Sequence, residues 1–147
     1  RPPINGGSGF PASGVHTNPW NLARFGWLFA NRGVWNGSRL LSERYLDHAT
    51  TTRAPAVPMF DPDAWYSPLP GNYGFNWWTT APPDDPLAIW PHAPAGTFAA
   101  QGNLNNMCLI IPAWRLVFLR MGLDGVVDNR LYDRVFEILG RNPGSEK

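Results

Sequence analysis

The spacing of apolar residues predicts a helix near the start of the chain. Apolar side chains occupy almost every position between residues 19 and 30, so we expect this helix to be buried on several sides. Asn18 or Thr17 can cap its first turn, and Pro19 suits the first helical position, where its missing N–H would have no partner anyway. Residues 31–33, which include a glycine, should end it.

A turn and a second, shorter helix should follow. Asn36 and Gly37 supply the positive backbone dihedrals that a tight reversal needs. Ser42 is a suitable N-cap, and Glu43 complements the positive end of the helix dipole. Three residues then fall on one side of the helix: Tyr45, Leu46 and Ala49.

Short runs of aromatic and β-branched residues predict strands in the second half of the chain. They cover residues 73–79, 97–102, 107–111 and 116–121. The last three runs are separated by turn-forming segments of hairpin length, which predicts an antiparallel meander. Two proline-dense segments, residues 53–70 and 81–96, should form long loops.

A final amphipathic helix is predicted from Asn129 to Leu139, capped by Asp128 and closed by Gly140. Its apolar stripe, which should cover the sheet, consists of Leu131, Val135, Ile138 and Leu139, with Tyr132 and Phe136 beside it. Helices followed by a meander and a terminal helix indicate the α+β class rather than alternating βαβ units. We therefore expect an antiparallel sheet of three to four strands with a C-terminal helix.

Composition excludes several classes of partner. The chain has 147 residues, a net charge of +1 and no basic run, so we expect no nucleic-acid partner. The longest apolar stretch, Phe25 to Ala30, is far shorter than the roughly 20 residues of a membrane span. The sole lysine is Lys147, which excludes an internal lysine base. Because the chain opens with Arg1-Pro2-Pro3 and not with methionine, we expect it to be a piece of a longer protein.

Candidate chemistry is sparse along the chain. His16, His48 and His92 lie far apart with no ligand at metal-binding spacing, so we expect neither a metal nor a cofactor. No serine has a lysine three residues later, and none lies in Gly-x-Ser-x-Gly. Cys108, inside a predicted strand, is interpreted as a small buried hydrophobe rather than a reactive thiol.

Tryptophans offer a second kind of candidate site. Several of the eight lie near the proline-dense segments, where exposed rings could stack on sugars or apolar acyl groups. They are Trp65, Trp77, Trp78 and Trp90. The competing interpretation, which we favour, is that these rings fill the core.

The order of motifs resembles the serine β-lactamase superfamily, in its class C β-lactamase, DD-peptidase and esterase type. Residues 12–26 and 31–42 are similar to its S-G-G-L-x-S-T-A-x-D-L-A-R-F-G and N-G-G-x-W-x-G-K-R-L-L-S stretch. Residues 73–78 resemble its Y-G-x-G-W strand, and residues 97–112 resemble its F-G-H-x-G-x-G-G-Q and D-P strand pair. The resemblance covers nearly the whole chain but only the C-terminal half of the family's domain.

This resemblance implies a site at the end of one strand. The family's K-T-G or H-x-G motif falls on Ala100, Gln101 and Gly102, which would bind substrate. The backbone N–H of Asn103 would be one donor of the oxyanion hole, a role that requires only correct placement. Ala100 departs from the motif because it carries no charge to hold a carboxylate, which favours an esterase, an amidase or an inactive relative over penicillin-type recognition.

The resemblance also implies what lies outside the chain. The nucleophile motif S-x-x-K and the motif Y-x-N would come from an N-terminal segment, so the chain should be catalytic only when completed by it. Residues 1–60 would be part of a helical lobe, and residues 61–147 part of the sheet lobe, of an incomplete β-lactamase-like fold. The expected partners are this N-terminal half or a second copy, with a small ester, amide or peptide as substrate.

Two further expectations follow. Because the N-terminal helix and strands of the family are missing, the chain should expose an unpaired strand edge and an apolar face on its first helix. The family's proteins are commonly exported, which implies a periplasmic or secreted location. The alternative function, from another class, is a non-catalytic binding module that keeps the fold and holds a peptide or glycan on its Trp-rich loops.

Overall fold

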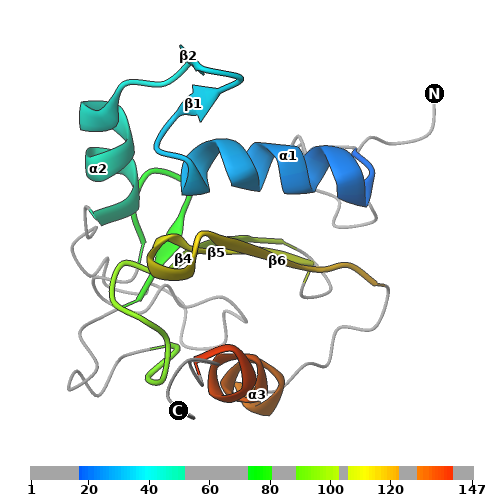
Figure 1. Ribbon diagram of the computed structural model, residues 1–147. Helices are drawn as coiled ribbons and strands as arrows, with labels where there is room; N and C mark the ends of the chain where they lie inside the picture. The colour runs from blue at the N-terminus through cyan, green and yellow to red at the C-terminus, as the bar shows by residue number, and fades with distance from the viewer. Residues whose placement is uncertain (1–16, 52–72, 81–88, 103–105, 123–128, 141–147) are drawn as a thin grey trace, which may run out of the picture.

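The computed structural model describes residues 17–51, 73–80, 89–102, 106–122 and 129–140. Within these residues three α-helices and antiparallel strands form three layers. Figure 1 shows α1 on one side of the meander and α3 on the other, with α2 beside the C-terminal end of α1. The fold is α+β with a C-terminal helix, as the sequence predicts.

Helix α1 (Pro19–Ala30) begins and ends where its capping residues predict. The Asn18 side chain accepts a hydrogen bond of 2.9 Å from the Asn21 N–H. Gly33 has φ +79°, and a Cβ there would lie 2.4 Å from the Leu41 carbonyl oxygen. Only glycine therefore suits this exit, because the backbone is left-handed and the space is already occupied.

A small hairpin and α2 follow α1. β1 (Val34–Trp35) and β2 (Ser38–Arg39) pair across the predicted turn, in which Asn36 and Gly37 both have positive φ. Helix α2 (Glu43–Thr51) is capped by the Ser42 hydroxyl, which accepts a hydrogen bond from the Tyr45 N–H. Leu46 and Ala49 are buried, as predicted, whereas Tyr45 is exposed.

The second sheet is an antiparallel meander in the order β3-β4-β5-β6. Its strands are β3 (Trp78–Thr79), β4 (Phe98–Gln101), β5 (Met107–Ile111) and β6 (Leu116–Arg120). Phe98 pairs with Ile110, and Ile110 with Val117. A 3-10 turn (Pro112–Trp114) and Arg115, with φ 50°, connect β5 to β6.

The predicted strand over residues 73–79 is wrong in its first part. Only Trp78 and Thr79 belong to a strand, and Tyr73 meets Trp78 in an isolated bridge. The Gly74 N–H donates to the Trp77 carbonyl at 2.7 Å, and Asn76 has φ 64°. Gly74 and Asn76 thus allow a tight reversal that the aromatic content of the segment concealed.

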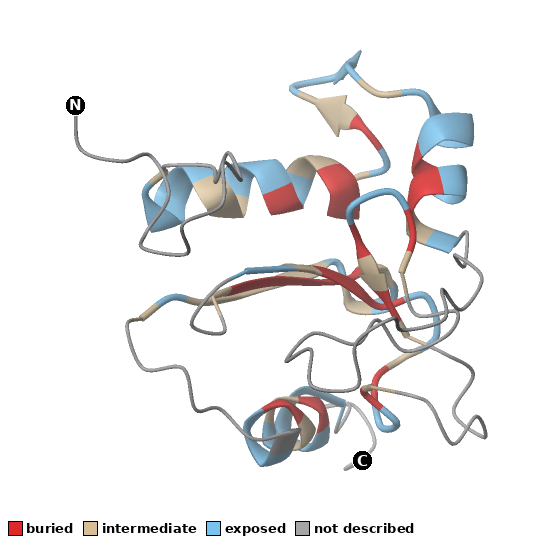
Figure 2. Cartoon of the chain, turned by 180° about the vertical axis from the view of Figure 1, so that it is seen from behind, coloured by how far each residue is buried: buried red, intermediate tan, exposed pale blue. Residues whose placement is uncertain are grey.

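Two apolar clusters lie on the two faces of the meander. On the α1 and α2 face, Phe29, Leu46 and Trp77 pack with Phe98, Cys108 and Ile110. On the α3 face, Trp90, Tyr132 and Phe136 pack with Ala99, Met107, Leu109 and Ile111. β5 is buried along its whole length (Figure 2), because it is central in the sheet and covered on both faces.

Helix α1 is not buried on several sides, which corrects the first prediction. Only Gly26, Phe29 and Ala30 are buried, and Trp20 is 78% exposed. The reason is that α1 packs mainly through one side, which lies on β5 and β6. Gly26 permits this approach, since a Cβ there would lie 2.7 Å from Val117 Cγ1 and 2.8 Å from Cys108 Sγ.

The terminal helix α3 (Asn129–Gly140) forms as predicted but faces the sheet with a different side. Tyr132 and Phe136 are buried, whereas Leu131, Ile138 and Leu139 are exposed. Two aromatic rings four residues apart lie one turn above the other and fill the space beside Trp114 and Phe118. The larger rings bury more apolar area than the aliphatic stripe, which explains the rotation. The predicted cap, Asp128, lies outside the described residues.

Candidate functional site

The end of β4 carries the residues that the sequence singles out. Ala100 pairs with Cys108 and Gln101 with Met107, so both lie opposite the first half of β5. The Gly102 N–H donates to the Asn106 carbonyl at 2.8 Å and extends the hairpin one step beyond β4. The structure therefore brings Ala100, Gln101 and Gly102 together at one end of a hairpin. Asn103, the predicted oxyanion donor, lies outside the described residues.

These three residues differ in their surroundings. Ala100 is half-buried and packs against the cluster on the α1 face. Gln101 and Gly102 are both exposed. A Cβ on Gly102 would meet no atom of the described residues within 4 Å, so the space beside its backbone is open toward them. The end of β4 is thus a place where a ligand can reach the main chain directly.

Asn106 is a residue of this region that the sequence argument missed. Its side-chain oxygen accepts a hydrogen bond of 2.8 Å from the Gly122 N–H, which ties the start of β5 to the end of β6. Its carbonyl also receives the Gly102 N–H. An asparagine in a turn-forming segment is the signal that could have found it, because its side chain readily bonds to nearby backbone.

Cys108 is buried in β5, where it pairs with Ala100 of β4. Its side chain is 1% exposed, and burial raises the pKa of its thiol to about 12. A thiol is nucleophilic as the thiolate, so Cys108 is inert at neutral pH. The interpretation of Cys108 as a small buried hydrophobe is confirmed.

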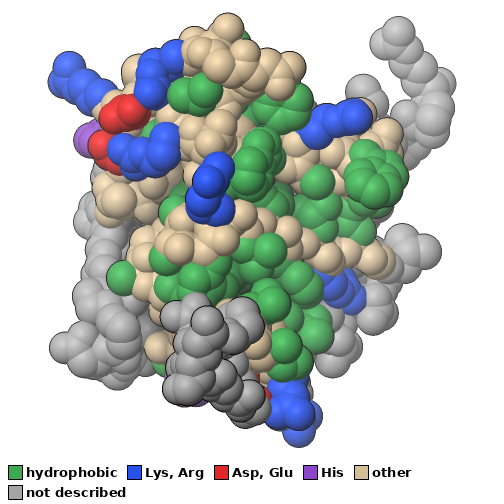
Figure 3. Space-filling view, in the orientation of Figure 1, with side chains coloured by type: hydrophobic (Ala, Val, Ile, Leu, Met, Phe, Trp, Pro, Cys, Tyr) green, Lys and Arg blue, Asp and Glu red, His purple; other side chains and the backbone are tan. Residues whose placement is uncertain are grey.

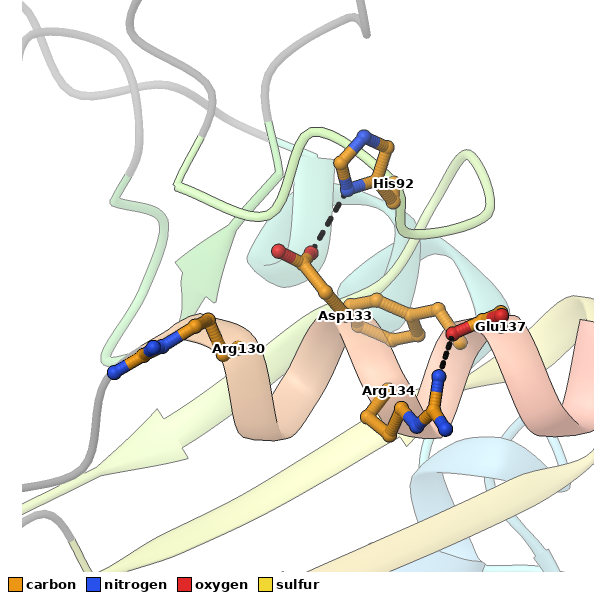
Figure 4. Close-up of a pocket in the computed structure, with 6 residues that line it drawn as sticks. His92, Arg130, Asp133, Arg134 and Glu137 are labelled. Carbon is orange, nitrogen blue, oxygen red and sulfur yellow. Dashed lines mark hydrogen bonds and ion pairs between the residues drawn. The ribbon is translucent and has the colours of Figure 1, made fainter.

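A separate hollow of about 520 Å³ lies against α3. Figure 4 shows His92 above the helix, with its Nδ1 2.9 Å from Asp133 Oδ1, and Arg134 turned toward Glu137 at 2.6 Å. Arg130 points away from the other side chains in this view. His92 and Asp133 are 41 positions apart, so only the tertiary structure brings them together.

This hollow has an oriented imidazole but no reaction partner among its lining residues. Its lining consists of His92, Arg130, Asp133, Arg134, Phe136 and Glu137. None of these side chains is a hydroxyl or thiol nucleophile. Arg134 forms an ion pair with Glu137, and the His92 ring contacts the Asp133 carboxylate. The His92 side chain is 70% exposed, so its contact with Asp133 is a solvent-screened link between a loop and α3.

His48 lies edge-on to Phe75, with ring centroids 5.0 Å apart, and His16 lies outside the described residues. The described part of the chain contains no group of three His, Cys, Asp or Glu side chains that could hold a metal ion. It also contains no helix that is long and apolar enough to cross a membrane.

Two of the four candidate tryptophans lie in the core. Trp77 and Trp90 are buried, and Trp78 is half-buried with its ring edge-on to Tyr73. Trp77 packs against Phe29 and Phe98. Trp65 lies outside the described residues. The core interpretation is therefore confirmed for Trp77 and Trp90.

Comparison with family models and with curated proteins adds no assignment. No family model and no curated protein matches the chain. The functional argument therefore depends on the end of β4 and on the motifs themselves.

Proposed function

We propose that the chain is the C-terminal portion of a serine hydrolase of the β-lactamase-like superfamily. The support is the order of sequence motifs together with the meander β4-β5-β6, which has a helix on each face. The observation that carries the proposal is the exposed end of β4, where Gly102 leaves the backbone open to a ligand.

The proposed reaction is acyl transfer to water. A serine of the upstream segment attacks the ester or amide carbonyl, the alcohol or amine departs, and water then hydrolyses the seryl ester. The carbonyl oxygen becomes negative in both steps, and the Asn103 N–H donates a hydrogen bond to it. Such a donor acts through its position alone, so the end of β4 needs no titrating side chain.

Ala100 narrows the substrate class. Its methyl group packs against the core and carries no charge, so this position offers a substrate carboxylate neither an ion pair nor a side-chain donor. The proposed substrate is therefore a small ester, amide or peptide bound mainly through backbone hydrogen bonds. Gln101, exposed beside it, is the side chain placed to select among such substrates.

Active-site labelling tests the proposal. The chain is produced together with the segment encoded directly upstream and treated with a fluorophosphonate probe. We expect a covalent adduct on a serine of the upstream segment and none on the 147-residue chain alone. Absence of an adduct from the joined protein, when the same probe labels a known serine esterase, would contradict the proposed hydrolase.

A pair of substitutions tests the backbone donor. Asn103→Pro removes the N–H, whereas Asn103→Ala retains it. We expect the proline variant of the joined protein to lose about 10²–10³ in labelling rate. The alanine variant should stay within about threefold of the parent, since the donor is the main chain. Equal rates for the two variants would exclude Asn103 as the donor.

A non-catalytic binding module is the second candidate function, and Ala100 favours it. The resemblance places a lysine or histidine at this position, and alanine can do no chemistry there. Persistent silence of the joined protein toward the probe supports this candidate. The burial of Trp77 and Trp90 means that a ligand would not be held by those two rings.

A further inference from the structure

Asn106 joins the ends of three strands. Its backbone carbonyl accepts a hydrogen bond of 2.8 Å from the Gly102 N–H, one step beyond β4. Its side-chain oxygen accepts a second bond of 2.8 Å from the Gly122 N–H, beyond the end of β6. Met107 makes the last ladder pairs of β5 with both neighbouring strands, so these two bonds continue the sheet past its regular end. One residue therefore links β4, β5 and β6 where the candidate site lies.

These two bonds hold the connection that carries the proposed oxyanion donor. Residues 103–105 lie between Gly102 and Asn106, and the bond between the backbones of Gly102 and Asn106 closes this connection at its base. The side-chain bond to Gly122 attaches the same base to β6, so the start of β5 cannot turn away from the sheet. A functional group is placed accurately when the residues that support it are themselves fixed by hydrogen bonds.

The acceptor at this position is neutral. Residues 97–122 contain no Asp or Glu. In Figure 3 the acidic side chains of the visible face lie mainly over α2, and Figure 1 shows α2 and the end of β6 on opposite sides of the molecule. A carboxylate in place of the Asn106 amide would accept the same bond but would repel the negative oxygen that forms during acyl transfer. The amide thus provides the attachment without opposing the proposed chemistry.

We propose that Asn106 is a positioning residue of the oxyanion hole, which holds the Asn103 N–H in place through its bonds to Gly102 and Gly122. The proposal rests on the proposed hydrolase function and adds a residue that acts through another residue and not on the substrate. An oxyanion donor must lie about 2.7–3.1 Å from the oxygen, and a displacement of about 1 Å can cost about 10²-fold in rate. Loss of the side-chain bond should therefore slow acyl transfer without weakening substrate binding.

The test uses the joined protein and the fluorophosphonate probe at a series of concentrations, which gives the maximal labelling rate and the half-saturating concentration separately. Asn106→Ala should lower the maximal rate by about tenfold or more and change the half-saturating concentration by less than about threefold. The matched control is Asn31→Ala, which removes a bond of 2.7 Å from the Asn31 amide to the Val34 carbonyl, between α1 and β1. Its maximal rate should stay within about threefold of the parent. Equal rates for the two variants would overturn the proposal.

Substitution of the donor shows whether the bond itself matters. Gly122→Pro removes the N–H that Asn106 accepts, whereas Gly122→Ala keeps it. The proline variant should lose as much labelling rate as Asn106→Ala, and the alanine variant should keep the parent's rate. Asn106→Ala and Gly122→Pro combined should lose no more than either alone, because both remove the same bond. Additive losses would show that the two residues act separately, against the proposal.

A measurement on the 147-residue chain alone separates the positioning role from the hydrolase chemistry. In a proton–nitrogen correlation spectrum, Gly122→Pro should shift the backbone amide of Asn103, although the two residues are distant in sequence, and Gly122→Ala should shift it much less. An Asn103 amide that is unchanged in the proline variant would overturn the positioning role and leave labelling of the parent unaffected. A joined parent protein that takes up no probe would instead overturn the hydrolase, and the catalytic role of Asn106 with it.

Discussion

At the scale of single residues, the close contact of α1 with the sheet depends on Gly26. It lies where α1 crosses β5 and β6, and a Cβ there would approach both Val117 and Cys108 to less than 3.0 Å. Val117 is β-branched and stiff, and Cys108 is fully buried, so neither can move aside easily. At an ordinary glycine inside a helix, replacement by alanine favours the helix and stabilises the fold. At Gly26 we expect the same replacement to destabilise the fold.

Gly26→Ala should lower the free energy of unfolding by about 1–3 kcal/mol, because the added methyl overpacks the helix–sheet contact. Chemical denaturation followed by tryptophan fluorescence measures the change. Gly102→Ala is the matched control and should stay within about 0.5 kcal/mol, since its Cβ would meet nothing within 4 Å. Adding Val117→Ala to Gly26→Ala should recover part of the loss. A stabilising Gly26→Ala would show that α1 does not pack this closely.

The Cys108 thiol should make stability fall at alkaline pH. Its pKa is about 12 in the folded chain against 9.0 for the unperturbed thiol, because burial disfavours the thiolate. The contribution of the buried Cys108 thiol to stability is thus complete below about pH 9 and is lost as the pH rises from about 9 to 12. Cys108→Ala should reduce this alkaline loss, measured as the difference in unfolding free energy between pH 8 and pH 10.5. An equal loss in both proteins would contradict the assignment to Cys108.

At the scale of the elements, the size of the aromatic rings decided which side of α3 faces the sheet. The hydrophobic spacing indicated a stripe through Leu131 and Ile138, but Tyr132 and Phe136 make the contact with the sheet. The Tyr132 hydroxyl is buried without a hydrogen-bond partner among the described residues, and burial raises its pKa. This residue therefore contributes through its ring and not through its oxygen.

Substitutions on α3 distinguish the two possible faces. Phe136→Ala and Tyr132→Ala should each lower the free energy of unfolding by about 3–5 kcal/mol, whereas Ile138→Ala should change it by less than about 0.5 kcal/mol. Tyr132→Phe should be neutral or stabilising, because it removes an unpaired hydroxyl. Thermal or chemical denaturation gives all four values. A greater loss at Ile138 than at Phe136 would restore the stripe indicated by the sequence.

At the scale of the whole molecule, the described residues form three layers, with α1 on one face of the meander and α3 on the other. The sequence resemblance predicted both an exposed strand edge and an exposed face on the first helix, and the described residues show β6 at the end of the sheet and Trp20 in solvent.

Local chemistry in the sequence determined where most elements begin and end. Caps and turns join residues that are close in sequence, so they can be recognised from the sequence alone. Examples are the Asn18 cap, the Asn36-Gly37 turn and the Ser42 cap. The strands of the meander were also predictable, because short runs of aromatic and β-branched residues are joined by turn-forming segments of hairpin length. The candidate site at Ala100, Gln101 and Gly102 was identified from motif order; Ala100 and Gln101 end β4, Gly102 follows it, and their role in binding substrate stays a prediction.

Only the tertiary structure decided which sides of these elements meet. The approach at Gly26, the rotation of α3, the reversal at residues 73–77 and the contact of His92 with Asp133 depend on atoms distant in sequence. Periodicity fixes that a helix has an apolar side, but packing volume selects which side chains fill the available space.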